Sequence, residues 1–299
     1  MTQASAPGKI VLFGEHSVVY GQPAIAAPVF GVKSTTTIKK ADEFSIQLMN
    51  QVKKEKAMKA IKLTVENTLQ TLNQTDANFK LNIDSQVPIA SGMGSGAAVG
   101  VSVIRAMSKY FQKDLSNQQI SEIDYKTEQF LHTHPSGIDN TVIAHEQAIL
   151  FQKGKMQPIT IGKPMLIMIA NTGIRSSTKA ALEHVHNQWE KDPEKYETYF
   201  EKAGRIAREG KKAIEKGQLE RIGQLMTEFQ EFYRQIDMSH PENEKLVQAA
   251  LDKGALGSKI SGKGRGGCVI ALTEEENRET IRNAWKKLEP EVIIETTIK

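Results

Sequence analysis

Two glycine-rich segments and one polar segment hold the residues of this sequence that are best suited to chemistry. The first, Ser-Gly-Met-Gly-Ser-Gly-Ala-Ala at residues 91–98, leads straight into a predicted helix. Its glycines leave backbone N–H groups uncovered, and a helix start adds partial positive charge, so the segment suits a phosphate group. A simple turn stays open as an alternative, because short glycine patterns are weakly specific.

The same segment contains the pattern G-x-G-x-x-A at Gly92, Gly94 and Ala97, which is also found in dinucleotide-binding folds. In those folds the first glycine directly follows a strand near the N-terminus. Here the predicted strand ends near Ile83, and Pro88 intervenes. The segment is not a Walker loop either, because no Lys-Ser/Thr pair follows its last glycine. Neither of these two nucleotide-binding patterns therefore applies.

The second glycine-rich segment, Lys-Ile-Ser-Gly-Lys-Gly-Arg-Gly-Gly-Cys, covers residues 259–268 and joins two strand-like stretches. Lys263 and Arg265 add positive charge to it. On its own, a flexible hairpin loop is the simpler interpretation. The two cations would serve either to attract phosphate or only to keep the loop solvated, and the sequence does not choose between these roles.

The polar segment is Thr-His-Pro-Ser-Gly-Ile-Asp-Asn, residues 133–140, in which Asp139 is expected in a turn. Glu128 lies eleven positions upstream on a predicted helix, where a solvated glutamate would be ordinary. His132 and His134 are not predicted to form a metal site, because no third ligand is near them in sequence.

Composition excludes several classes of protein. The chain has 299 residues, a net charge of +4 and one cysteine, so neither a disulfide framework nor a strongly basic nucleic-acid binder is expected. The lysine-rich stretch 53–62 is predicted to be the solvent-exposed side of a helix rather than a nucleic-acid site. No secretory signal or membrane span is recognisable, which predicts a cytoplasmic protein without a membrane partner.

The elements that must position these residues have an α+β order. Strands are expected over 8–13, 29–38, 44–49, 79–83, 165–170, 255–260, 268–272 and 291–298. Helices are expected over 52–72, from Ser95 to Phe111, over 117–132 with Ser116 as N-cap, within 176–253, and over 274–287. The proline- and glycine-containing stretch 158–164 predicts two lobes, residues 1–160 and 161–299.

Three segments together resemble the signatures of the GHMP small-molecule kinases: residues 6–21, 88–98 and 259–268. Phe-Gly-Glu-His-Ser-Val-Val-Tyr-Gly and Pro-Ser-Gly-Ile-Asp-Asn are most similar to the mevalonate kinase branch. The resemblance covers nearly the whole chain. It implies a two-lobed α+β fold, with a ribosomal-protein-like N-terminal lobe, a ferredoxin-like C-terminal lobe and the active site in the cleft between them.

The resemblance also implies roles for individual residues in phosphoryl transfer from ATP to the primary hydroxyl of mevalonate. Asp139 would be the general base or hydrogen-bond acceptor, with Lys9 in an ion pair beside it. Glu128 would hold Mg²⁺. The substrate side would include Glu15, His16 as partner of the mevalonate carboxylate, and Thr172. The ATP phosphates would be held by Pro88, Ser91, Gly92, Met93, Gly94, Ser95, Gly96 and Ala97.

Some residues depart from the family pattern. Gly96 stands where a second serine is usual, so the Mg²⁺ ligand is either Ser95 or a water in place of the missing hydroxyl. A related kinase for another alcohol or a phosphorylated substrate such as phosphomevalonate is the main alternative. A non-catalytic member is disfavoured, because Lys9, Glu128 and Asp139 are all present. The oligomeric state stays open, with a homodimer as one candidate.

Overall fold

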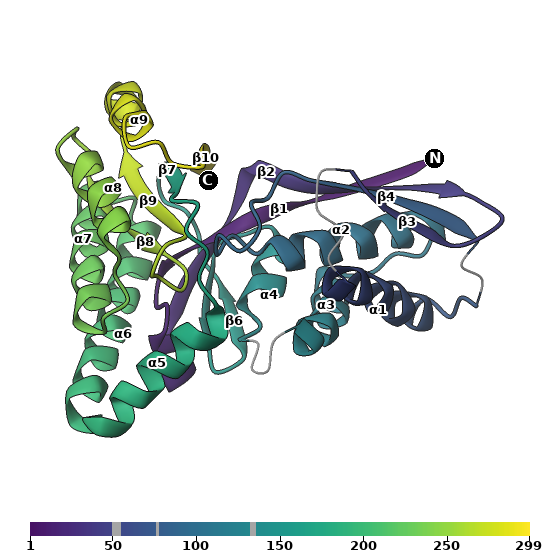
Figure 1. Ribbon diagram of the computed structural model, residues 1–299, viewed down its shortest axis with the longest axis horizontal. Coiled ribbons are helices and arrows are strands. Elements are labelled where there is room, and N and C mark those ends of the chain that lie inside the picture. The colour runs from purple at the N-terminus through teal and green to yellow at the C-terminus, as the bar shows by residue number, and fades with distance from the viewer. Residues whose placement is uncertain (50–54, 76–77, 132–135) are drawn as a thin grey trace. The chain divides into compact units, whose positions relative to one another are not determined.

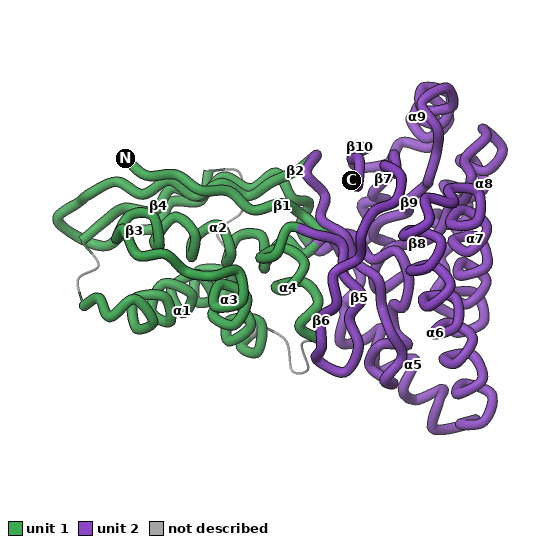
Figure 2. Tube along the Cα trace, turned by 180° about the vertical axis from the view of Figure 1, so that it is seen from behind, with its two compact units in different colours: residues 1–9, 32–89, 94–146 green, residues 10–31, 90–93, 147–299 purple. Residues whose placement is uncertain are grey.

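The computed structural model describes residues 1–49, 55–75, 78–131 and 136–299. These residues form two compact units that alternate along the sequence, shown in two colours in Figure 2. Unit 1 comprises residues 1–9, 32–89 and 94–146, and unit 2 comprises 10–31, 90–93 and 147–299. The domains predicted from sequence, 1–160 and 161–299, are continuous ranges and stay a prediction.

Unit 1 is a sheet with helices on one side (Figure 1). The second half of β2 (Ala24–Lys40) pairs antiparallel with β4 (Phe79–Ser85), β3 (Ser45–Leu48) runs parallel to β4, and β1 (Thr2–Phe13) pairs with β2. The helices are α1 (Glu55–Thr71), α2 (Ser95–Tyr110), α3 (Asn117–Leu131) and α4 (Ile138–His145). Alternate strand residues such as Ile38, Leu81 and Ile83 pack with Val65 and Val103 of the helices into one core.

The helices α1 and α3 confirm the sequence periodicity. On α1, Ile61 and Val65 are buried while Lys59 and Lys62 are exposed, so the lysines of its described part face solvent as expected. α3 begins after Ser116, whose Oγ accepts a hydrogen bond of 3.2 Å from the Gln119 backbone N–H. The Gln119 side chain accepts in return from the Ser116 N–H at 3.0 Å, so the predicted N-cap is a complete capping box.

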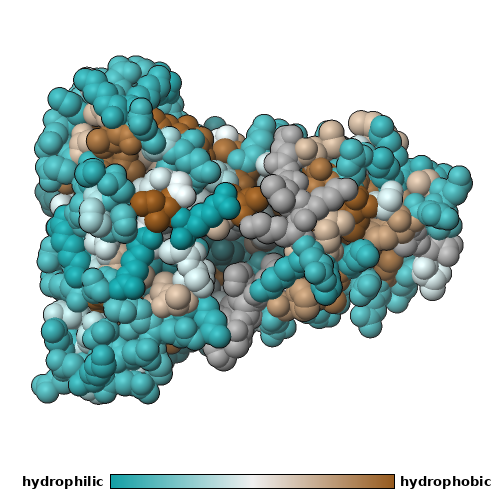
Figure 3. All heavy atoms as spheres, viewed as in Figure 1, coloured by the Kyte–Doolittle hydropathy of each residue, from teal (hydrophilic) through white to brown (hydrophobic). Residues whose placement is uncertain are grey.

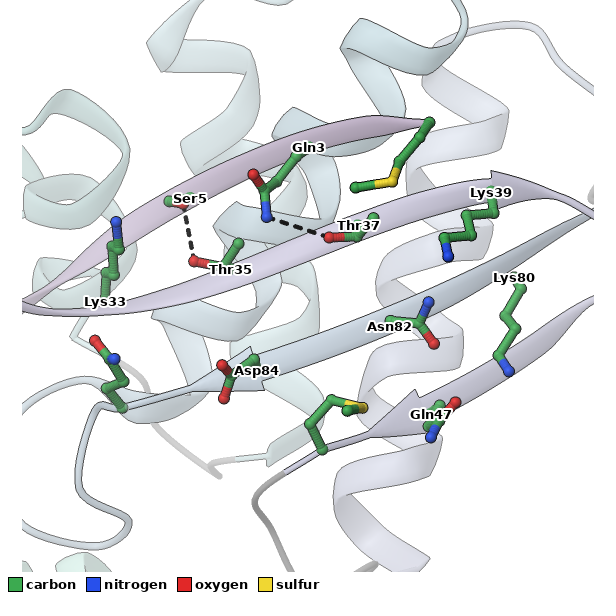
Figure 4. A pocket seen from close by; sticks show the side chains of 13 residues that line it. Gln3, Ser5, Lys33, Thr35, Thr37, Lys39, Gln47, Lys80, Asn82 and Asp84 are labelled. Atoms are coloured by element: carbon green, nitrogen blue, oxygen red, sulfur yellow. Dashed lines mark hydrogen bonds between the residues drawn. The ribbon is translucent and has the colours of Figure 1, made fainter.

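The other face of the unit 1 sheet is polar and carries a shallow hollow of about 650 Å³ (Figure 4). Hydrogen bonds join Ser5 to Thr35 and Gln3 to Thr37 across neighbouring strands. Lysines 39 and 80 lie directly opposite each other in the strand register. Like charges in such a pair repel each other, and water weakens this repulsion. The pair therefore indicates a face exposed to water rather than one packed against protein.

Unit 2 contains an antiparallel sheet of order β10-β7-β9-β8. Its strands are β7 (Met165–Asn171), β8 (Gly257–Ser261), β9 (Cys268–Thr273) and β10 (Val292–Ile298). In addition, β5 (Ile149–Gln152) pairs with the start of β2 and with β6 (Lys155–Pro158). Neither β5 nor β6 is among the strands predicted from the sequence. The predicted α+β class is confirmed.

The long helical region predicted over 176–253 consists of four helices: α5 (Thr178–Lys191), α6 (Pro193–Glu215), α7 (Leu219–Gln235) and α8 (Pro241–Leu251). The helix α9 (Arg278–Lys286) follows a short 3₁₀ turn, η2 (Glu275–Asn277). α7 lies directly on β8. The contact is made by Gly223 of α7 and Gly257 of β8, and a methyl group on Gly257 would come within 2.0 Å of the Gly223 carbonyl oxygen. Cys268 is buried, which is common for a cysteine that packs as a small apolar side chain.

The outer surface over α5 to α7 is mostly hydrophilic in Figure 3. None of the helices in the described part of the chain combines the length and the hydropathy that crossing a lipid bilayer requires.

Candidate active site

In unit 1, Lys9 and Asp139 form the predicted ion pair. The Lys9 Nζ lies 2.8 Å from Asp139 Oδ1, with 6% of the lysine side chain and 34% of the aspartate side chain exposed. The pair is therefore confirmed, while the catalytic roles of its members stay predictions. Because the lysine is almost fully buried, its charge is poorly screened by water and acts strongly on anything beside it.

Asp139 lies in the first turn of α4, and its expected place in a non-helical turn is wrong. Gly137, with φ of 81°, lies immediately before the helix, which starts at Ile138. Asn140 fixes α4 on α3 by donating to the carbonyl and hydroxyl oxygens of Ser121, at 3.0 and 2.9 Å. A carboxylate in the first turn also lies near the positive end of the helix dipole, which is a common position for an acidic residue.

The end of the glycine-rich segment lies directly against this ion pair. Gly94 has φ of 69° and precedes Ser95, the first residue of α2. A methyl group on Gly94 would come within 3.1 Å of the Lys9 Cγ and 3.5 Å of Asp139 Oδ2. Glycine is thus required here both by the backbone angle and by the close approach. The N-terminal N–H groups of α2 start beside the lysine and the aspartate.

The first turn of α2 supplies backbone donors rather than a charged side chain. Gly94 contributes no side-chain cap, so the first N–H groups of the helix stay available to a ligand. The Ser95 hydroxyl donates a hydrogen bond of 3.3 Å to the Val87 carbonyl oxygen. Because this bond uses the hydroxyl hydrogen, the oxygen lone pairs can still face a cation. Gly96 offers no side-chain oxygen, and Ala97 is buried.

Two acidic residues of α3 are buried in unit 1. Glu128 is 8% exposed, and burial, followed by repulsion from Asp139, raises its pKa to about 7 against a smaller opposite effect of Lys9. Asp124, one helical turn earlier, is 1% exposed, and burial raises its pKa well above the ordinary value. Asp124 is not among the residues predicted from the sequence; its signal there is an acidic residue in the buried stripe of the helix, beside Ile120 and Ile123.

In unit 2, residues 91–93 lie next to the other glycine-rich loop. A methyl group on Gly92 would be 3.3 Å from the Ser261 carbonyl oxygen, and one on Gly267 would be 3.1 Å from the Ser91 carbonyl oxygen. The Ser91 hydroxyl accepts a hydrogen bond of 3.3 Å from the Met93 N–H, and the Met93 side chain is buried. The structure thus brings together two predicted loops that are about 170 positions apart in sequence.

His16 is held by that second loop. Its Nε2 lies 2.9 Å from the Lys263 carbonyl oxygen, and since a carbonyl can only accept, Nε2 carries the proton. The Nδ1 atom is buried without a hydrogen-bond partner. Burial lowers the pKa of His16 to about 4, partly offset by the Lys263 hydrogen bond. The ring is therefore neutral at pH 7 and presents Nδ1 as an acceptor.

This buried histidine predicts a loss of stability in acid. Between pH 6.5 and about 4 the unfolded chain binds a proton at residue 16 that the folded chain does not, so the free energy of unfolding falls as the pH falls through this range. The contribution is about 3 kcal/mol. In His16→Gln we expect a shallower decline of stability, measured by urea unfolding at several pH values. His186→Gln, at a half-exposed histidine, should keep the parental slope; an equally shallow slope there would contradict the assignment.

Glu15 forms a buried ion pair with Lys259 that the sequence analysis did not foresee. Lys259 Nζ lies 2.6 Å from Glu15 Oε1, and the two side chains are 0% and 4% exposed. The ammonium group also lies 5.1 and 5.6 Å from the ring centres of Phe229 and Tyr233. Glu15 Oε1 further accepts from the Gly262 N–H at 3.4 Å. The carboxylate thus holds the second glycine loop, and its predicted contact with substrate stays a prediction.

Thr172 lies at the same loop. Its backbone N–H and its hydroxyl both donate to the Gly267 carbonyl oxygen, at 3.0 and 3.1 Å, and the Ile174 N–H donates to the hydroxyl oxygen at 3.2 Å. Thr172 therefore lies against the second glycine-rich loop, residues 259–268. Its predicted role in substrate binding is a separate matter and stays a prediction.

Arg265 has local partners that account for its charge. One terminal nitrogen lies 2.7 Å from Asp237 Oδ2 and 3.0 Å from His184 Nε2, and its Nε donates to the Asp237 carbonyl oxygen at 3.1 Å. Whether its charge attracts phosphate or only keeps the loop solvated stays open. Arg265 fastens the glycine loop to the end of α7.

The described residues contain no group of three or more His, Cys, Asp or Glu side chains arranged to hold a metal ion. A divalent cation here would need ligands from a bound nucleotide, as is usual for Mg²⁺ in phosphoryl transfer. His132 and His134, which the sequence analysis considered as a metal pair, lie outside the described residues.

Comparisons with known proteins agree with this arrangement. Residues 55–147 match the family described as "GHMP kinases N terminal domain", and residues 211–291 match "GHMP kinases C terminal". A mevalonate kinase of Thermococcus gammatolerans is 32% identical over 92% of this chain and 90% of its own length. A structure of L. major mevalonate kinase in complex with R-mevalonate has a TM-score of 0.89 and 29% identity, covering 100% of this chain and 96% of that one. The Methanococcus jannaschii mevalonate kinase has a TM-score of 0.88 and 26% identity, with 99% and 98% covered.

Proposed function

The chain belongs to the mevalonate kinases within the GHMP kinase family, and on this premise we propose that it transfers the γ-phosphoryl group of ATP to the primary hydroxyl of (R)-mevalonate. The products are 5-phosphomevalonate and ADP. The observation that carries the proposal is the Lys9–Asp139 ion pair against Gly94, at the start of α2. It combines an acid–base group, a fixed positive charge and uncovered backbone donors in one place within unit 1.

Each of these parts meets one need of phosphoryl transfer. Asp139 accepts the proton or the hydrogen bond of the attacking hydroxyl. Lys9, buried beside it, lowers the pKa of that hydroxyl and neutralises charge on the group being transferred. The N–H groups at the start of α2 bind phosphate oxygens with the favourable end of the helix dipole. The loop residues from Pro88 to Ala97 provide this phosphate contact.

Mg²⁺ is proposed to accompany ATP, and the donor set suits it. Glu128 is a buried carboxylate, and Ser95 keeps its oxygen lone pairs free while its hydroxyl donates to the Val87 carbonyl. Both are oxygen ligands, which this hard cation prefers. When bound, the ion would neutralise the ATP phosphates. Glu128 and Ser95 would hold it together with phosphate oxygens.

Mevalonate recognition is assigned to Glu15, His16 and Thr172 as a proposal. The neutral His16 offers an acceptor at Nδ1, which suits a hydroxyl group of the substrate. Pairing with the mevalonate carboxylate instead requires the ring to take up a proton on binding. Glu15 acts by holding the loop that carries the Lys263 carbonyl. A homodimeric assembly and a cytoplasmic location stay predictions from the sequence.

The test is an ADP-release assay on the purified chain with ATP and Mg²⁺. (R)-mevalonate should support turnover, while 5-phosphomevalonate, galactose and (S)-mevalonate should give rates near the background without acceptor. Phosphorus NMR of the product should show a new phosphomonoester. A higher kcat/KM for phosphomevalonate or a sugar than for (R)-mevalonate would replace the proposed substrate, and no turnover with any acceptor would refute the activity.

A further inference from the structure

Asp124 is a buried carboxylate that the proposed reaction does not yet use. It lies on α3 four positions before Glu128, so the two side chains project from the same side of the helix one turn apart. Its neighbours on the buried stripe are Ile120, Ile123 and Thr127. An acidic group with 1% exposure at such a position requires an explanation, because a buried carboxylate is costly without compensation.

The carboxylate has little compensation in the protein itself. Its Oδ2 has no hydrogen-bond partner. Its Oδ1 lies against α2, where a methyl group on Gly100 would come within 1.8 Å of it. Repulsion from Glu128 and Asp139 adds to burial in disfavouring its charge. Asp124 is therefore a buried carboxylate with one oxygen unpartnered, which a positive charge nearby would stabilise.

Its place in unit 1 points to the source of that charge. Gly100 is four residues beyond Gly96 on α2, and Glu128 is four residues beyond Asp124 on α3, so each step is about 6 Å along a helix axis. Asp124 thus borders the part of the α2–α3 contact that holds the proposed cation ligands. Gly96 adds no side-chain hydroxyl to this part of the contact.

We propose that Asp124 is an additional ligand of the Mg²⁺ that accompanies ATP, acting through a water molecule of the cation. This inference rests on the proposed function, because it requires a nucleotide-bound divalent cation. Mg²⁺ commonly keeps several waters and is bound by one or two carboxylates together with phosphate oxygens. Outer carboxylates that orient such waters typically contribute 10- to 100-fold to metal affinity. Asp124 and Glu128 would then share the cation, and Gly100 is needed to admit the second carboxylate.

The experiment measures Mn²⁺ as a probe of the Mg²⁺ site, with a non-hydrolysable ATP analogue and no mevalonate. Electron paramagnetic resonance counts free Mn²⁺ and gives its dissociation constant in the ternary complex. Asp124→Asn should weaken Mn²⁺ binding at least tenfold. Binding of the same analogue in EDTA should not change. Glu122→Gln, the same change of charge at an exposed position of α3, should match the parent.

A second variant approaches the same carboxylate from the other helix. Gly100→Ala adds a methyl group where Asp124 now lies, so the carboxylate must move and Mn²⁺ affinity should fall in the same direction. Circular dichroism will show whether Asp124→Asn folds. If it does not fold, Gly100→Ala provides the test of the same carboxylate. Parental Mn²⁺ affinity in the folded Asp124→Asn protein would overturn the inference and leave Asp124 as a structural acid. A parent that binds Mn²⁺ with the analogue but fails to phosphorylate mevalonate would refute the proposed substrate alone.

Discussion

Asp139→Asn should lower kcat for mevalonate phosphorylation by about 10³-fold while leaving the fold intact. The amide keeps the shape of the side chain but cannot accept the hydroxyl proton. It also leaves the Lys9 ammonium, 2.8 Å away in the parent, without its counter-charge. Because the aspartate is one-third exposed, the change should affect catalysis far more than stability. Steady-state ADP release at saturating ATP and mevalonate measures the effect.

Two further variants make this result specific. Asp114→Asn removes a carboxylate from an exposed position of unit 1 and should keep the parental kcat. Lys9→Met should lower kcat by a similar factor to Asp139→Asn, and the double variant should be little worse than either, because residues that act as a unit are not additive. Near-parental activity in Asp139→Asn, with a parental melting temperature, would remove the aspartate from the mechanism.

Lys259→Met should reduce the free energy of unfolding of unit 2 by about 3 to 5 kcal/mol. The methionine fills most of the volume, but it leaves the Glu15 carboxylate buried without a counter-charge. Both tryptophans, Trp189 and Trp285, lie in unit 2, so urea unfolding followed by tryptophan fluorescence reports on this unit. The loss should be larger than that of any substitution of an exposed lysine.

The double variant Lys259→Met/Glu15→Gln distinguishes lost charge compensation from lost packing. Replacing both partners removes the unpaired charge, so more than half of the stability lost in the single variant should return. Lys245→Met, at an exposed ion pair with Glu242, serves as the control and should change stability by less than about 1 kcal/mol. If the double variant is as unstable as the single one, the aromatic packing around Lys259 is the dominant contribution.

Much of the fold followed from periodicity and capping signals. The helices α1 and α3 appear where apolar residues recur at helical spacing, and Ser116 caps α3 as its type and position indicate. α4 was missed because its eight residues are too few for a periodic pattern and follow Pro-Ser-Gly, a strong turn signal. Short strands such as β5 and β6 depend on their pairing partners rather than on their own composition.

The candidate site, like the fold, could be predicted from the sequence only in part. The resemblance of the motifs led to Lys9 and Asp139, and the ion pair between them is present. It could not lead to Asp124 or Lys259, because a charged residue in an otherwise apolar stripe is ordinarily interpreted as a helix or strand boundary. What makes their burial feasible is supplied by distant residues: Gly100 for the aspartate, and Glu15 for the lysine. These distant residues are brought in by the tertiary structure, so the charged residue in the apolar stripe is a signal that the local sequence cannot interpret.

The interleaving of the two units has a consequence for synthesis on the ribosome. Residues 10–31 belong to unit 2, and Val11 exchanges hydrogen bonds of 3.0 Å with the Ser261 hydroxyl, 250 positions later. Because protein synthesis adds about 5 to 20 residues per second, roughly 10 to 50 s pass between the synthesis of this early segment and the synthesis of β8. Until then its apolar residues, among them Leu12 and Phe13, lack their final partners. Nascent chains of this protein should therefore depend on chaperones until the last strands emerge.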